Sequence, residues 1–150
     1  MYKEILVPLD GSPLAEGALP HARALSKAFD ARITLLCVIE PIEMYSQPGM
    51  IGPVVSVSMD VKEESENLKG YLDKIADDLK KEGIEARTVV KEGDAASEIC
   101  DYADQNHEGI IVMSTHGRSG IQRWVYGSVA DKVLRSANVP VLLIRAHGKS

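Results

Sequence analysis

Residues 5–39 read ILVPLDGSPLAEGALPHARALSKAFDARITLLCVI, and this stretch decides the fold. It begins and ends with short apolar runs, Ile5–Leu9 and Ile33–Ile39, whose residues do not alternate with polar ones. Strands that are buried on both faces have such sequences. Between the runs, apolar residues recur at spacings of three or four, which predicts an amphipathic helix. These residues are Leu14, Ala18, Ala22, Leu25 and Phe29.

The same alternation of apolar runs and helical stripes continues to the end of the chain. Further strands are predicted at Ala86–Val90, Ile110–Met113 and Val139–Ile144. We therefore expect an α/β fold with an open five-stranded parallel sheet and helices on both faces, Rossmann-like, in a single domain over residues 1–150. The helical stripes are Leu68, Leu72, Ile75 and Leu79, then Ala96, Ile99, Cys100 and Ala103, then Val129, Val133, Leu134 and Ala137.

Composition excludes several classes of function. Seventeen Lys and Arg stand against 22 Asp and Glu, a formal net charge of −5, which argues against nucleic-acid binding as the main function. The longest apolar runs have only six or seven residues, too few to cross a membrane. The start, MYKEILVPLDGS, lacks the apolar region of a signal peptide. We expect a cytoplasmic protein without a membrane partner.

The cysteines and histidines of the sequence do not indicate a metal site or a reactive thiol. Cys37 and Cys100 lie at apolar positions and are expected to be reduced core residues. The histidines show no ligand spacing with each other or with a cysteine, so no metal site is predicted.

Local signals predict where helices begin. Ser12 before Pro13, Asp94, and Ser128 with Asp131 are each expected to cap the helix that follows. Residues Pro41–Val61 hold prolines and glycines without a steady period. This segment is predicted to be either a loop over one edge of the binding face or a flexible insertion.

Candidate ligand-binding residues follow the first and fourth predicted strands. Ligands of open parallel sheets bind at the carboxyl ends of the strands, where the chain direction reverses. Asp10 follows the first strand, and STHGRSG (114–120) follows the fourth. Strand order 3-2-1-4-5 brings both into one crevice, and the glycine loop favours it over 2-1-3-4-5.

Glycines and a helix start near this crevice suggest a phosphate site. Glycine lets backbone N–H groups approach a ligand, and Gly127-Ser128 opens the last helix. The alternative is a flexible connection with an ordinary cap. Asp10 is expected to contact a ribose hydroxyl or another polar group; a metal held through phosphates and a solvated loop remain alternatives. His116 is expected to serve loop structure or ligand contact, with a general base as the lesser alternative.

Common nucleotide and hydrolase motifs are absent from the sequence. There is no G-x-x-x-x-G-K-[ST] and no G-x-S-x-G, and DGSPLAEG after the first strand lacks G-x-G-x-x-G. A phosphoacceptor receiver domain needs paired acidic residues after the first strand, where only Asp10 stands. These absences argue against a P-loop NTPase, a serine hydrolase, a nicotinamide-binding Rossmann domain and a receiver.

Three separated motifs resemble the universal stress protein family over essentially the whole chain. They are KEILVPLDGS (3–12), MSTHGRSG (113–120) followed by GSVADKVL (127–134), and PVLLIR (140–145). The resemblance implies a five-stranded parallel sheet in the order 3-2-1-4-5, a homodimer, and in many members ATP bound through G-x-x-G, nine residues, then G-[ST]. Gly117 and Gly127-Ser128 match that pattern, and Ser114 stands at its first glycine.

By the same resemblance, Asp10 would contact the ribose, Val38 and Met113 the adenine, and the glycine-loop residues the phosphates. A serine takes positive φ only at a cost, so Ser114→Gly is expected to raise affinity if this position is the weak point. The predicted site for ATP, with or without Mg²⁺, comprises Pro8, Asp10, Val38, Met113, Ser114, His116, Gly117, Arg118, Gly127, Ser128 and Val129.

Three functions from different classes follow. The first is a regulatory stress-response protein that binds ATP as a signal and is not an enzyme. The second is a nucleotide-free interaction module that works through its dimer surface and the Pro41–Val61 segment. The third is an enzyme that slowly hydrolyses ATP or transfers phosphate. In each case the apolar run Val139–Ile144, at a sheet edge in order 3-2-1-4-5, is expected to pair with a second copy.

Overall fold

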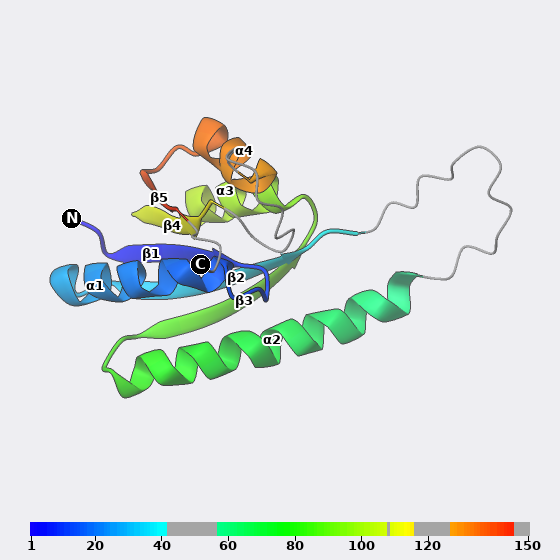
Figure 1. The fold of residues 1–150 in the computed structure, drawn as a ribbon, viewed down its shortest axis with the longest axis horizontal. Helices are drawn as coiled ribbons and strands as arrows, with labels where there is room; N and C mark the ends of the chain where they lie inside the picture. Colours follow the sequence, from blue (N-terminus) through cyan, green and yellow to red (C-terminus); the bar gives the residue numbers. More distant parts are fainter. Residues whose placement is uncertain (42–56, 108, 116–126, 146–150) are drawn as a thin grey trace, which may run out of the picture.

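The computed structural model describes residues 1–41, 57–107, 109–115 and 127–145, and only the backbone of residues 57–60. Its strands form one five-stranded sheet in the order β3-β2-β1-β4-β5, and every neighbouring pair is parallel (Figure 1). The predicted fold class and strand order are therefore confirmed. The strands are β1 (Glu4–Leu9), β2 (Arg32–Ile39), β3 (Ala86–Glu92), β4 (Ile110–Ser114) and β5 (Val141–Ile144).

Helices cover both faces of this sheet (Figure 1). One face carries α1 and α2, and the other carries α3 and α4. The helical elements are η1 (Ala15–Ala18, a 3₁₀ turn), α1 (Leu19–Phe29), α2 (Val57–Lys81), α3 (Ala95–Gln105) and α4 (Ser128–Ser136). In the part of the chain that is described, no helix is both long and apolar enough to cross a membrane.

Burial on both faces explains why the strand sequences do not alternate. In β1, Ile5 and Val7 pack in the layer under α1 and α2, while Leu6 packs in the layer under α3 and α4. All three are fully buried. Cys37 and Cys100 lie buried in the two layers, one in each, as expected of core residues. Helices on both faces thus require apolar residues at the buried positions of the central strand, Ile5–Leu9.

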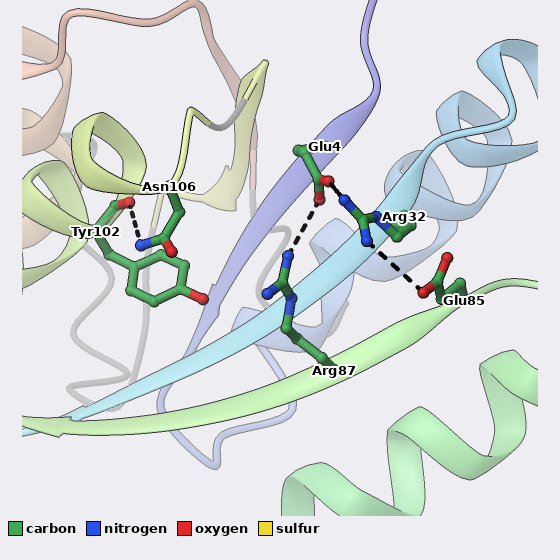
Figure 2. A network of polar contacts seen from close by, with 6 residues as sticks. All are labelled: Glu4, Arg32, Glu85, Arg87, Tyr102 and Asn106. Atoms are coloured by element: carbon green, nitrogen blue, oxygen red, sulfur yellow. Dashed lines mark hydrogen bonds and ion pairs between the residues drawn. The ribbon is translucent and has the colours of Figure 1, made fainter.

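Ion pairs connect the amino ends of the first three strands (Figure 2). This end of the sheet is opposite to the carboxyl ends of the strands. Glu4 pairs with Arg32 of the neighbouring strand and with Arg87 of β3, whose Nη2 lies 3.6 Å from Glu4 Oε2. Arg32 Nη1 also lies 3.8 Å from Glu85 Oε1. This network of ion pairs connects the three neighbouring strands β1, β2 and β3 at their first residues.

The predicted loop Pro41–Val61 is wrong at its end, because α2 already begins at Val57. The prolines and glycines that suggested a loop all lie before residue 54. Residues 57–61 therefore contain no helix breaker, and they extend the helix that the Leu68 stripe predicts. Residues 42–56 lie outside the described part of the chain.

Two of the three predicted helix caps are wrong. Asp94 does cap α3: its Oδ2 accepts from the Ser97 N–H at 3.1 Å and from Ser97 Oγ at 2.8 Å. The N-cap of α4, however, is Gly127, without a side-chain cap, and Ser128 is the first helical residue. The first helix begins as a 3₁₀ turn with Leu14 as its N-cap, so Ser12 supports the turn without being its cap.

Asp94→Ala is expected to lower the free energy of unfolding by about 1 kcal/mol at neutral pH. The hydrogen bonds from Ser97 lower the pKa of the Asp94 carboxyl from its ordinary value of 3.8. A carboxyl with a lowered pKa stabilises the fold above its ordinary pKa and loses that contribution as the pH falls through the lowered value. Urea denaturation should therefore show the difference from wild type at neutral pH and a shrinking difference below pH 3.8.

The matched control is Ser128→Ala, at a helix start that has no side-chain cap. Its free energy of unfolding should stay close to that of the wild type. Equal losses for the two variants would contradict the assignment of the caps.

Candidate functional site

A cleft of about 360 Å³ opens at the carboxyl ends of β1, β2 and β4, beside the first residues of α3 and α4. The carboxyl ends of parallel strands all lie at the same end of a sheet, and the order β2-β1-β4 makes these three strands neighbours. Most of the predicted site residues line this cleft: Pro8, Asp10, Val38, Met113, Ser114, Gly127, Ser128 and Val129. His116, Gly117 and Arg118 lie outside the described residues, so their predicted roles stay predictions.

Divergence of β1 and β4 opens the cleft between them. The pairing of β1 with β2 continues as far as Leu9, whereas its pairing with β4 covers Ile5 and Leu6 only. Pro8, which follows in β1, has no N–H to give to a ladder. The two central strands therefore part before they end, and the space above the gap is lined by side chains of both.

Asp10 builds the turn that leaves β1. Its Oδ1 accepts from the Ser12 N–H at 2.9 Å and from Ser12 Oγ at 2.6 Å. Ser12 Oγ accepts in turn from the Ala15 N–H at 3.3 Å, and Gly11 has φ +87°, which favours glycine. Asp10 thus has a local structural role that the sequence analysis did not assign to it. The carboxylate holds the turn and also lines the cleft.

The first turn of α4 is pinned to the end of β4. Gly127 N–H donates to the Thr115 carbonyl at 2.7 Å, and Asp131 N–H donates to the Gly127 carbonyl at 3.0 Å. The first N–H groups of a helix have no partner within the helix, and among the described residues no side chain caps this end. Ser128 and Val129 both line the cleft. The positive end of the α4 dipole is therefore available to an anionic group of a ligand.

The start of α3 differs from that of α4, although both border the cleft. The Glu40 carboxylate accepts from the Ala95 N–H at 3.2 Å, and Asp94 caps the same turn. Two carboxylates thus already occupy this N-terminus. Glu64 of α2 and Asp10 line the cleft as well. An anion is consequently favoured at the α4 end of the cleft and disfavoured at the α3 end.

Apolar side chains form the floor of the cleft. Leu36 and Met113 are buried, and Val38 packs against the same layer under α3 and α4. Ile99 of α3 borders the same space. A flat, apolar group of a ligand could stack here without losing a hydrogen bond.

Sequence reasoning missed Glu40, Glu64 and Ile99. Glu40 follows β2 directly, so the rule that selected Asp10 after β1 would have found it. Glu64 and Ile99 carried no such signal, because they reach the cleft from helices whose placement depends on packing.

Ser114 is the last residue of β4 and pairs with Ile144 of β5. Outside glycine, the described residues with positive φ are Asp30 and His107. The backbone at Ser114 therefore does not need the conformational freedom of glycine, and the conformational reason for regarding Ser114 as a weak point is wrong.

Helix α2, which lines the cleft with Glu64 and Leu68, is connected to η1 by a hydrogen bond. Tyr71 Oη donates to Glu16 Oε2 at 2.9 Å. Burial, and then the Glu16 carboxylate, raise the pKa of the Tyr71 hydroxyl above its ordinary value. One turn earlier, Leu68 lies beside Gly11, where an added Cβ would stand 3.7 Å from Leu68 Cδ2. The α2 side of the cleft is thus attached to the turn that Asp10 holds.

Comparison with known proteins assigns the family. A family model described as "Universal stress protein family" matches residues 1–145. The chain belongs to this family. It is 32% identical to universal stress protein MJ0531 of Methanocaldococcus jannaschii, over 99% of this chain and 85% of that protein. The solved structure of MJ0577, a universal stress protein of the same organism, superposes with a TM-score of 0.85 at 28% identity, covering 99% of both chains.

Two more distant universal stress protein structures share the fold and contain ligands. One, in complex with cAMP, has a TM-score of 0.69 at 18% identity and covers 97% of this chain and 99% of its own. The other, from Archaeoglobus fulgidus in complex with dAMP, has a TM-score of 0.62 at 22% identity, covering 95% and 98%.

Asp10→Ala is expected to lower the free energy of unfolding by about 1 kcal/mol, because the Ser12 N–H and hydroxyl lose their acceptor. Asp10→Asn keeps an oxygen that can accept both bonds, so it should retain most of the wild-type stability. Urea denaturation of the two variants measures the difference. Unchanged stability of the alanine variant would show that the turn does not depend on this carboxylate.

Proposed function

We propose that this protein binds an adenine nucleotide, ATP first of all, in the cleft at the carboxyl ends of β1, β2 and β4. The observation that carries the proposal is the uncapped start of α4 beside an apolar floor. The N–H groups at the start of α4 can bind the phosphates of ATP, and the apolar floor can hold its purine ring. The cAMP and dAMP complexes of the two fold neighbours support the same ligand class.

The division of charge in the cleft orients the nucleotide. Phosphates lie toward Gly127 and Ser128, because the α3 end already holds the Glu40 and Asp94 carboxylates. The adenine lies over Val38 and Met113, and Asp10 reaches the ribose hydroxyls. The described residues hold no group of three His, Cys, Asp or Glu that could bind a metal ion. Mg²⁺, where it takes part, is proposed to accompany the phosphates.

We further propose that the bound nucleotide acts as a signal in a cytoplasmic stress-response protein, without catalysis. The test is calorimetric titration of the purified protein with ATP, with and without Mg²⁺, followed by an assay for released ADP. Saturable binding without steady ADP release supports the proposal. Steady release would favour a phosphate-transferring enzyme, and absence of binding would favour a nucleotide-free interaction module.

Gly127→Val is expected to weaken ATP binding more than tenfold. The φ of Gly127 is −56° and its ψ is 145°, angles that valine also adopts, so the fold should survive. The branched side chain would stand at the helix start that borders the cleft and block approach to its N–H groups. Gly70→Val is the control, because Gly70 lies on α2 with open space around it. This variant should bind ATP as the wild type does.

The dissociation constants for ATP of both variants and the wild type measure the effect. A folded Gly127→Val protein with wild-type affinity would contradict placement of the phosphates at α4.

We also propose that the protein forms a homodimer through the β5 edge, over Val139–Ile144. The two edges of the sheet differ: β3 carries Arg87, Lys91 and Glu92, whereas β5 reads VLLI without a charge. Charged residues protect a sheet edge from pairing with another chain, and an uncharged apolar edge invites it. All four residues of β5 are half-buried in the single chain. A two-fold contact would cover them.

Leu142→Lys is expected to yield monomeric or insoluble protein, because a charge would be buried at the two-fold contact. Val141→Lys should behave alike. Val89→Lys, at a half-buried position of the opposite edge strand β3, is the control and should keep the oligomeric mass of the wild type. Light scattering after size exclusion gives the mass, and circular dichroism shows that each variant is folded. A folded Leu142→Lys protein with an unchanged dimer mass would exclude this interface.

A further inference from the structure

The hydroxyl of Ser114 is buried in the wall of the cleft without a hydrogen-bond partner. Ser114 is 7% exposed, and its Oγ forms no hydrogen bond with the described residues. A buried hydroxyl without a partner destabilises the protein that contains it. Such a group calls for an explanation, and here it borders the space that the nucleotide is proposed to fill.

Two features of β4 determine on which side of the strand the Ser114 side chain lies. Successive side chains of a strand point to opposite faces: Ile110 and Val112 pack in the layer under α1 and α2, and Ile111 in the other. Ser114 continues the side of Ile110 and Val112, where Ala15 of η1 also borders the cleft. The Thr115 N–H donates to the Ile144 carbonyl at 2.9 Å, which holds the end of the strand in the ladder.

Other buried polar atoms of the described residues make a useful contrast. Thr34 Oγ1 is likewise buried without a hydrogen bond, but Thr34 lies within β2 and does not line the cleft. Glu4 Oε2 and Arg23 Nε, which also lack hydrogen bonds, each have an ion-pair partner. Ser114 thus combines an unpartnered buried hydroxyl with a place at the cleft.

We propose that the Ser114 hydroxyl donates a hydrogen bond to an oxygen of the ribose 5′-phosphate portion of the bound nucleotide. The inference rests on the proposed nucleotide function and adds a specific contact to it. Serine here provides a donor that the glycine of the family pattern lacks. Ser114→Gly should therefore lower affinity, opposite to the expectation from the motif alone.

The test compares the affinities of Ser114→Ala, Ser114→Gly and Thr34→Val with the wild type, using calorimetric titration with AMP and with ATP. Both Ser114 variants should bind each nucleotide about tenfold more weakly, the loss expected for a hydrogen bond to a phosphate or ribose oxygen. Thr34→Val removes the other unpartnered hydroxyl and should bind both nucleotides as the wild type does.

Thermal melting without nucleotide separates a ligand contact from a structural role. Free Ser114→Ala protein should melt at the wild-type temperature or above it, because the variant loses an unsatisfied group. Unchanged or tighter binding by the Ser114 variants, with normal binding by the wild type, would overturn this inference and leave the proposed function standing. A wild type that binds neither AMP nor ATP would overturn both.

Discussion

The central strand β1 is paired on both edges and buried on both faces, and the rest of the structure depends on this constraint. Its apolar residues must pack under helices on each side, so the strands beside it are parallel and reached by crossover connections. Its pairing with β4 ends at Leu6 while its pairing with β2 runs to Leu9. The crevice that results lies where the chain direction reverses, and the Asp10 turn and Ser114 stand on its two sides.

Much of this arrangement could be predicted because it follows from the spacing of apolar residues along the chain and from the burial of the strands. Apolar runs without alternation indicated the strands, and the rule that ligands bind at the carboxyl ends selected Asp10 and Gly127. The order 3-2-1-4-5 followed from requiring both near one crevice. These inferences use properties that neighbouring residues share, so they survive errors of one or two residues at element ends.

What could not be predicted depends on single hydrogen bonds or on helix placement. Ser128 has a capping side chain in a suitable pattern, yet Gly127 takes the cap position, and its N–H donates to the Thr115 carbonyl. Asp10 was assigned to a ligand, and it also accepts two bonds from Ser12. The position of Glu64 depends on how α2 packs over η1 through Tyr71 and Glu16. Sequence patterns do not specify such contacts.

Thr115 connects the proposed interface with the proposed site. Its N–H donates to the Ile144 carbonyl of β5 at 2.9 Å, and its carbonyl accepts from the Gly127 N–H at 2.7 Å. One residue thus joins the uncharged edge strand to the start of α4. Because a buried peptide group cannot lose its hydrogen-bond partner without cost, the residue that follows β4 ties both elements to this strand.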